Sequence, residues 1–266
     1  MMGVAGAIAG SVVARHGLAR RLPGWERTNF AERKVSLTGG LETAAGLLAG
    51  TLVAALPCPV TGMRAGARQS TATLVATLAA AGAGYIDDHL EDRFPAQGKG
   101  FHGHLGALKE GKLTSGLLKI AAIGAGALGA GALTGTHSGE KALDAALIAL
   151  SANFINLLDL RPGRARKVAS LAACAALPAT PLAQVSLGAA QAGIREDLLG
   201  KKMLGDLGAN AIGAHLGVAL TALPMRSKCA AVAGLIALTA ASEKVSFSAV
   251  IENTPVLREF DNLGRA

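Results

Sequence analysis

Apolar residues are gathered along the chain into long blocks, and short segments rich in charged residues separate these blocks. Marking the ionisable residues gives nine apolar blocks, at 2–14, 37–57, 69–86, 113–134, 142–158, 168–180, 181–194, 207–223 and 229–241. Several, such as 37–57 and 113–134, reach the roughly 20 residues that a helix needs to cross a bilayer. The shorter blocks are interpreted as spans that begin or end in polar, protein-buried surroundings. The pattern predicts one all-α, polytopic membrane helix bundle over residues 1–266, with about nine transmembrane helices.

The two ends of the chain differ in character. Basic residues follow the first apolar block and none precedes it, which is the wrong order for a cleaved signal peptide, so we expect a first span there. Residues 242–266 are polar with spaced apolar positions. This pattern predicts a cytoplasmic tail with an amphipathic helix lying at the membrane interface.

The composition excludes several classes of protein. Of the 266 residues, 51% are hydrophobic, 17% are charged and 3% are aromatic, and the mean hydropathy is +0.41. Ordinary soluble domains carry about 25% charged residues, and disordered chains are far less apolar than this one. The three cysteines (Cys58, Cys174 and Cys229) are scattered, so neither a disulfide scaffold nor a CxxC metal site is expected.

The net charge of +8 and the pI of about 9.8 are compatible with nucleic-acid binding, but the positions of the charges favour another interpretation. If the chain zigzags across a membrane, the loops at 15–36, 88–112, 160–168, 195–206 and 242–266 share one side. They hold 20 of the 26 Lys and Arg residues, against 5 on the other side. By the positive-inside rule the rich side is cytoplasmic, which gives an N-out, C-in protein and no nucleic-acid partner.

Acidic residues also collect at the predicted cytoplasmic ends of the blocks. The segment Gly84-Tyr-Ile-Asp87-Asp88 closes the third block. Adjacent carboxylates at a membrane edge repel each other unless a cation binds them. The alternative is a helix end that reaches water.

A glycine-rich basic loop follows, Lys99-Gly-Phe-His-Gly-His104, with further lysines at 109, 112 and 119. Backbone N–H groups and ammonium charges in such a loop suit phosphate contact. A flexible basic loop without a ligand is the alternative.

A third motif, Asn153-Phe-Ile-Asn156-Leu-Leu-Asp159, places two amides and a carboxylate at intervals of three residues, roughly along one helical face. Arg161, Arg164, Arg166 and Lys167 follow the Pro162-Gly163 break. Such polar groups at the end of an apolar span suggest a binding site. An amide network that joins helices is the alternative.

The fourth motif is Met203-Leu-Gly205-Asp206-Leu-Gly208, which opens the eighth block. Its glycines allow a ligand to approach the backbone, and a helix N-terminus favours phosphate. Asp206 as a plain N-cap is the alternative.

Taken in order, these motifs resemble those of the polyprenyl-phosphate N-acetylhexosamine-1-phosphate transferase superfamily, which includes the translocase that makes the first lipid intermediate of peptidoglycan. The matching segments are Gly84-x-x-Asp87-Asp88, Asn156-Leu-x-Asp159 and Met203-Leu-Gly205-Asp206-x-Gly208-Ala. The resemblance extends over roughly residues 25–220.

The resemblance implies a multi-pass protein of the bacterial plasma membrane that moves a sugar 1-phosphate from a nucleotide sugar, expected to be UDP-linked, to a polyprenyl phosphate. The transfer would occur at the cytoplasmic face in cell-envelope glycan synthesis, with Mg²⁺ or Mn²⁺, and would release a nucleoside monophosphate. The expected catalytic residues are Asp87, Asp88, Asp159 and Asp206, with Asp206 and Asp88 as metal ligands. The expected substrate-binding residues are Asn153, Asn156, Lys99, His104, Arg161, Arg164 and Gly205.

The chain also departs from the family pattern. Pro162 stands where the family has the second Asp of Asn-x-x-Asp-Gly-x-Asp-Gly, and Met203 stands where the peptidoglycan translocase has an aromatic residue. That enzyme's late His-rich motif is missing, so the peptidoglycan precursor is not the expected donor.

Two further interpretations stay open. One is a catalytically inactive relative that binds polyprenyl phosphate, and the other is a transporter or scramblase, which would need polar residues throughout the bilayer depth. The Gly- and Ala-rich helix faces could pack inside one bundle or in a homodimer.

Overall fold

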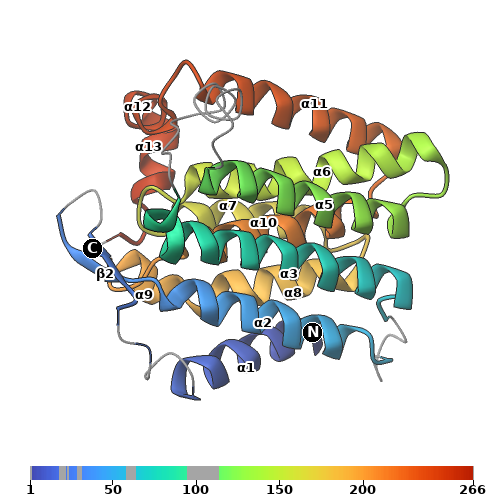
Figure 1. Ribbon diagram of the computed structural model, residues 1–266, viewed down its shortest axis with the longest axis horizontal. Coiled ribbons are helices and arrows are strands. Elements are labelled where there is room, and N and C mark those ends of the chain that lie inside the picture. Colours follow the sequence, from blue (N-terminus) through green and yellow to red (C-terminus); the bar gives the residue numbers. More distant parts are fainter. Residues whose placement is uncertain are drawn as a thin grey trace.

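Figure 1 shows the computed structural model of the chain, a bundle of roughly aligned helices. The structure describes residues 2–17, 22, 24–28, 32–57, 64–94 and 114–265. Its long helices are α1 (Met2–Gly17), α2 (Thr38–Ala54), α3 (Ala67–Leu90), α5 (Ser115–Thr134), α6 (Ser138–Leu158), α7 (Arg164–Ala176), α8 (Pro181–Ala192), α10 (Gly205–Leu220) and α11 (Met225–Ser242). The shorter ones are η2 (Glu91–Arg93), α9 (Ile194–Leu198), α12 (Phe247–Asn253) and α13 (Pro255–Asn262). Every predicted apolar block coincides with one long helix, so the helical prediction is confirmed.

Only some of the nine predicted spans correspond to helices that are long and apolar enough to cross a membrane. Among the described residues, α5 and α6 are long and apolar enough to cross a bilayer. The pair α11 and α12 would make a third span, bent by 98° at its break. At 1.5 Å per residue, the 13 residues of α7 and the 12 of α8 extend only about 20 Å. Nine crossings, and the N-out orientation, therefore remain predictions.

Helix α10 forms the centre of the bundle, and α2, α3, α6 and α8 pack around it. Nearly all of its residues are buried, because glycines let the neighbouring backbones come very close. A Cβ added at Gly208 would lie 2.5 Å from Cα of Gly40 on α2, and one at Gly217 would lie 2.6 Å from Cα of Ile148 on α6. This small-residue packing is typical of membrane helices.

One buried polar cluster lies in the middle of the bundle. His215 of α10 contacts the Thr51 hydroxyl through Nε2 at 3.0 Å and the Ser186 hydroxyl through Nδ1 at 2.8 Å. Both ring nitrogens have partners, so this group joins α2, α8 and α10.

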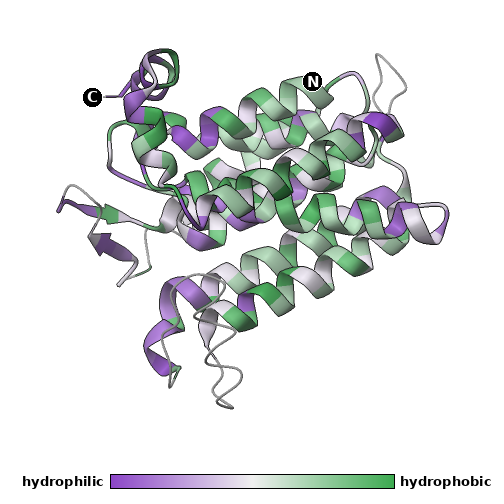
Figure 2. Ribbon diagram, turned by 90° about the horizontal axis from the view of Figure 1, so that it is seen from above, coloured by the Kyte–Doolittle hydropathy of each residue, from purple (hydrophilic) through white to green (hydrophobic). Residues whose placement is uncertain are grey.

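Hydrophilic residues concentrate towards the two ends of the bundle, while more hydrophobic residues occupy most of its middle (Figure 2). We call one end the acidic end, and define it by Asp87, Asp88, Asp159 and Asp206. The C-terminal ends of α1, α3, α6 and α8 meet the N-terminal ends of α2, α5, α7 and α10 there. This antiparallel arrangement brings the sequence motifs to one end of the bundle, as the zigzag predicts.

A short hairpin of β1 (Glu26–Thr28) and β2 (Lys34–Ser36) extends from the acidic end. Ser36 accepts a bond from the Met203 amide at 3.0 Å and donates its own amide to the Lys201 carbonyl at 3.1 Å. The hairpin thereby fixes the segment that leads into α10.

The C-terminal segment folds into α12 and α13 beside the start of α7. Arg164 forms a two-pronged ion pair with Asp261, at 2.8 Å through each of its two nitrogens. Val256 and Leu257 of α13 are exposed. The tail is therefore helical, and its position at a membrane interface remains a prediction.

Candidate functional site

The paired carboxylates at the end of α3 have different partners. Asp88 accepts the backbone N–H of Asp206 at 3.1 Å through Oδ1 and that of Leu207 at 2.9 Å through Oδ2. Its carboxylate therefore caps the N-terminus of α10 from another helix, and Leu204, the residue before α10, offers no side-chain cap. The interpretation of Asp206 as the N-cap was wrong, because Asp206 already lies in the first turn.

Two glycines make this cap possible. A Cβ at Gly84 would lie 2.2 Å from the Asp206 carbonyl oxygen, so only glycine lets α3 approach α10 so closely. Gly205 adopts φ +61°, in the left-handed region, and its missing side chain leaves room for the Asp88 carboxylate.

Lys119 of α5 joins the other two carboxylates. Its Nζ forms an ion pair with Asp87 and another with Asp206 at 3.1 Å. The three side chains are 14–23% exposed, so the group is largely but not completely buried. Asp87 lies 32 positions before Lys119 in the sequence and Asp206 lies 87 positions after it, yet both meet its ammonium group. The sequence analysis grouped Lys119 with the basic loop that suits phosphate contact, although this lysine lies inside an apolar block.

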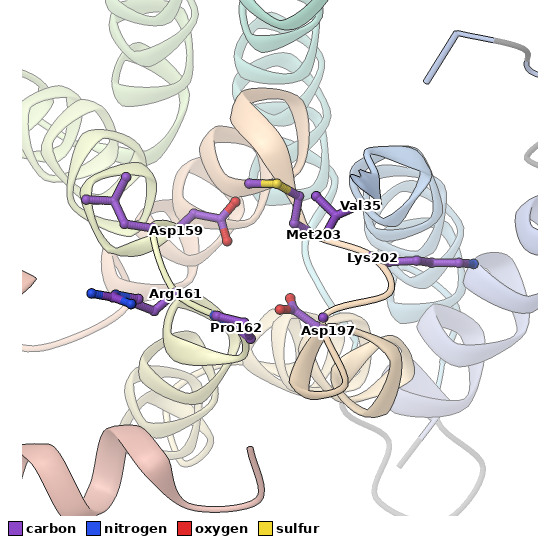
Figure 3. Close-up of a pocket in the computed structure, with 9 residues that line it drawn as sticks. Val35, Asp159, Arg161, Pro162, Asp197, Lys202 and Met203 are labelled. Atoms are coloured by element: carbon purple, nitrogen blue, oxygen red, sulfur yellow. The ribbon is translucent and has the colours of Figure 1, made fainter. Parts of the chain in front are cut away.

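A pocket opens beside this group, where the chain leaves α6. Asp159 follows the last turn of α6 and points into the pocket, and Asp197 faces it from α9 (Figure 3). Asp159 is 9% exposed, and its Oδ2 has no hydrogen-bond partner among the described residues. The other lining residues are Val35, Leu160, Arg161, Pro162, Gly200, Lys202 and Met203.

Asp197 is held by a buried network. It accepts the Gly163 amide at 2.8 Å and Nε of Arg166 at 2.9 Å. Arg166 is 1% exposed and also donates to the Thr43 hydroxyl at 3.0 Å. This network fixes the turn at Gly163, which has φ +75°, and so positions the loop that carries Asp159. Sequence reasoning grouped Arg166 with the basic loop and did not select it or Asp197 as a site residue.

Burial is the main electrostatic influence on the pocket carboxyls. Desolvation, followed by the negative charge of Asp197, raises the pKa of Asp159 well above its usual range. Arg166 and the backbone N–H of Gly205 oppose this rise. Desolvation also raises the pKa of Asp197, although Arg166 and the Gly163 amide act against it. Burial in the pocket therefore opposes ionisation of Asp159.

The remaining predicted substrate-binding residues are dispersed. Asn153 donates to the Thr239 hydroxyl on α11 at 3.3 Å, as in a network that joins helices. Asn156 is half-buried one turn before Asp159. Arg161 pairs with Glu252 at 2.6 Å at the rim of the pocket.

Other predicted residues lie elsewhere or outside the description. Arg164 is buried against the C-terminal segment rather than in the pocket. Gly205 lies between the pocket and the Asp88 cap. Lys99 and His104 lie outside the described residues.

An aromatic group borders the acidic end on the side of the hairpin. The ring of Trp25 lies 4.4 Å from that of His89 and 6.0 Å from that of Tyr85. Arg27 of β1 approaches Asp88 at 3.7 Å. Sequence reasoning did not select these residues, although Tyr85 lies within the matched segment Gly84-x-x-Asp87-Asp88.

The carboxylates of the acidic end are the candidate ligands of a magnesium ion. Among the described residues, no group of three or more His, Cys, Asp or Glu side chains is arranged to hold a metal ion. Mg²⁺, however, commonly uses one or two carboxylates and completes its shell with water and substrate phosphates. Asp87 and Asp206 converge on one cationic group, whereas both oxygens of Asp88 already accept backbone N–H bonds. Mg²⁺ bound by two carboxylates here would have to displace the Lys119 ammonium, and Asp87, rather than Asp88, would then join Asp206.

Comparison of the chain with protein-family models, with curated proteins and with solved structures finds no match.

Proposed function

We propose that this protein is an integral membrane enzyme that transfers a sugar 1-phosphate from a nucleotide sugar to a polyprenyl phosphate. In this reaction an oxygen of the acceptor phosphate attacks the sugar-bearing phosphorus of the donor, and the diphosphate bond of the donor breaks to release a nucleoside monophosphate. UDP is the proposed nucleotide, and the bacterial plasma membrane the proposed location.

The observation that carries this proposal is the meeting of Asp87 and Asp206 at Lys119, at one end of an apolar helix bundle. The reaction brings two phosphate-bearing anions together, so it needs positive charge and fixed positions more than covalent chemistry by the protein. Mg²⁺ held by Asp87 and Asp206 would screen the phosphate charges. Lys119 supplies a fixed ammonium beside those phosphates, and Asp88 keeps the start of α10 in place.

The position of the site supports a lipid acceptor. Helices α5 and α6 have the length and hydropathy of membrane spans, and Lys119 lies one turn inside α5. A site at this level can receive a lipid phosphate from the bilayer and a soluble donor from the aqueous side. The excess of basic residues in the loops at this end supports a cytoplasmic active site.

The test is a transfer assay on membranes that contain the full chain, with radiolabelled nucleotide sugars and undecaprenyl phosphate. We expect a lipid-linked sugar phosphate and an equal amount of nucleoside monophosphate, with a requirement for Mg²⁺. Asp206→Asn should abolish transfer, whereas Asp92→Asn, an exposed carboxylate in η2, should leave it intact. If no donor gives product with the full chain, the proposed activity is wrong.

A catalytically inactive relative that binds polyprenyl phosphate is the second candidate. It is favoured by Pro162 in place of the family's second Asp and by Lys119, which already neutralises the two carboxylates. Saturable binding of undecaprenyl phosphate without transfer from any nucleotide sugar would support this candidate against the first.

A further inference from the structure

Arg27 of β1 is a basic residue at the rim of the acidic end. Its Nη1 lies 3.7 Å from Oδ1 of Asp88, and its side chain is 54% exposed, whereas that of Asp88 is 1% exposed. At this distance the two charges attract each other, but the contact is too long for a hydrogen bond. Both oxygens of Asp88 already accept backbone N–H groups of α10. Asp88 therefore holds the guanidinium near the site without using its hydrogen-bond donors.

The hairpin directs Arg27 towards the site. Arg27 lies directly opposite Val35 in the register of β1 and β2, so the two side chains project from the same face of the hairpin. Val35 is buried and lines the pocket at Asp159 (Figure 3). The backbone bonds of Ser36 fix the hairpin against the segment that leads into α10. The face that carries Arg27 is therefore the face that borders the acidic end.

Lys119 and Arg27 differ in what they have left to bind. Lys119 is 19% exposed, and its ammonium already pairs with Asp87 and Asp206. The guanidinium of Arg27 has five N–H donors, and its contact with Asp88 leaves all of them without a hydrogen bond to a described residue. A guanidinium can bind two oxygens of one phosphate group at once, whereas an ammonium acts as a point charge. Arg27 therefore combines charge, exposure and available donors beside the site.

We propose that Arg27 is a phosphate-binding residue of the site, whose guanidinium binds the phosphate oxygens of a substrate. The inference rests on the proposed function and gives the β1–β2 hairpin a part in it. Asp88 contributes by position, because the same buried carboxylate caps α10 and attracts Arg27. The nucleotide sugar and the polyprenyl phosphate both present phosphate oxygens, so the experiment compares these two sources.

The inference is tested by binding rather than by turnover. The full chain in nanodiscs is titrated with UDP and, separately, reconstituted with increasing fractions of undecaprenyl phosphate. Trp25, the single tryptophan, lies two residues before Arg27, so its fluorescence reports binding at the hairpin. We expect Arg27→Gln to weaken the binding of at least one of the two ligands by about tenfold or more, as is typical for loss of a hydrogen bond between charged groups. Any binding of uridine or undecaprenol, which lack phosphate, should not change.

Two further variants separate the guanidinium from its charge. Arg27→Lys keeps the charge but loses the two-pronged geometry, so it should recover only part of the lost affinity. Lys34 lies opposite Thr28, on the other face of the same hairpin, and is exposed. Lys34→Gln therefore serves as the matched control for loss of one positive charge, and its affinities should stay within about twofold of the parent protein. Both side chains are exposed, so the thermal unfolding curves of all variants should agree.

Each outcome decides the inference separately from the proposed function. Unchanged affinities in Arg27→Gln overturn it, as do equal losses in Arg27→Gln and Lys34→Gln or a parent protein that binds neither ligand. A loss for UDP alone assigns Arg27 to the donor, and a loss for undecaprenyl phosphate alone assigns it to the acceptor. Binding that depends on Arg27, without transfer, supports the inference and contradicts the transferase. Transfer by Arg27→Gln with the kcat and KM of the parent protein supports the transferase and contradicts the inference.

Discussion

Replacing Gly84 by alanine tests the contact that assembles the acidic end. The added Cβ would lie 2.2 Å from the carbonyl oxygen of Asp206, 2.3 Å from its carbonyl carbon and 2.4 Å from the Leu207 nitrogen. All three atoms belong to the backbone, so no side-chain rotation can relieve the clash. Helix α3 and the start of α10 must therefore separate by roughly 0.8 Å before the Cβ reaches even about 3 Å from that oxygen, the closest approach that packed cores tolerate.

This separation acts directly on the Asp88 cap, whose two bonds measure 3.1 and 2.9 Å. Lengthening both by this amount takes them beyond hydrogen-bond distance and leaves a buried carboxylate without its donors. Overpacking of this kind costs about 1–3 kcal/mol, and loss of a bond to a charged group costs about 1.5–3 kcal/mol. We expect Gly84→Ala to lower the free energy of unfolding by about 3 kcal/mol.

Gly82 provides a matched control two residues earlier on the same helix. A Cβ there meets nothing within 4 Å, so Gly82→Ala should raise stability by up to about 1 kcal/mol through helix propensity. Unfolding of both variants is followed in detergent by circular dichroism, and transfer is measured in membranes. A displacement near 1 Å in a site that positions reactants lowers the rate by up to about 100-fold, so Gly84→Ala should lose most activity. Equal stability of the two variants would refute the close approach of α3 to α10.

Two further predictions concern pH and membrane position. Because the pKa of Asp159 is raised in the folded protein, the unfolded chain ionises first and stability falls as pH rises above about 4, the ordinary value of an Asp. Asp159→Asn should therefore raise the melting temperature more at pH 8 than at pH 5. An equal effect at both pH values would contradict a raised pKa of Asp159 in the folded protein. Trp25, the single tryptophan of the chain, packs against His89 in a tilted arrangement and lies near Tyr85, the single tyrosine, at the acidic end. Tryptophan and tyrosine prefer the membrane interface. The fluorescence of Trp25 should therefore be quenched more by lipids that carry a quencher near the head group than by lipids that carry it near the bilayer centre. The reverse order would show that the acidic end does not lie at the interface.

Much of the fold could be predicted because each helix has a local origin. The block at 113–134 became α5 (Ser115–Thr134), and the block at 142–158 became α6 (Ser138–Leu158), since apolar runs, with a single charge in each, end where Gly, Pro and further charged residues begin. The number of crossings could not be settled in this way. A block such as 168–180 contributes to a helix of 13 residues, and packing against neighbours decides whether so short a helix spans a membrane.

The sequence also predicted that the aspartate motifs share one end of the bundle, since an alternating chain returns there after every second helix. It did not predict the partners of each aspartate. Asp87 and Asp88 are adjacent in the chain, yet one pairs with Lys119 and the other caps α10. Asp197 joins Asp159 in the pocket although 38 positions separate them in the numbering. No local pattern specifies such pairs.

The sequence by itself determined an apolar, mainly helical chain whose carboxylates gather at one end. Both properties follow from composition and from the order of polar and apolar runs. Only the tertiary structure decided which carboxylate caps a helix, which pair shares an ammonium group and which oxygen stays unbonded in a pocket. Those assignments depend on backbone separations of a few ångströms, set at positions such as Gly84 and Gly205, and hydrogen bonds and ion pairs vary steeply over just that range.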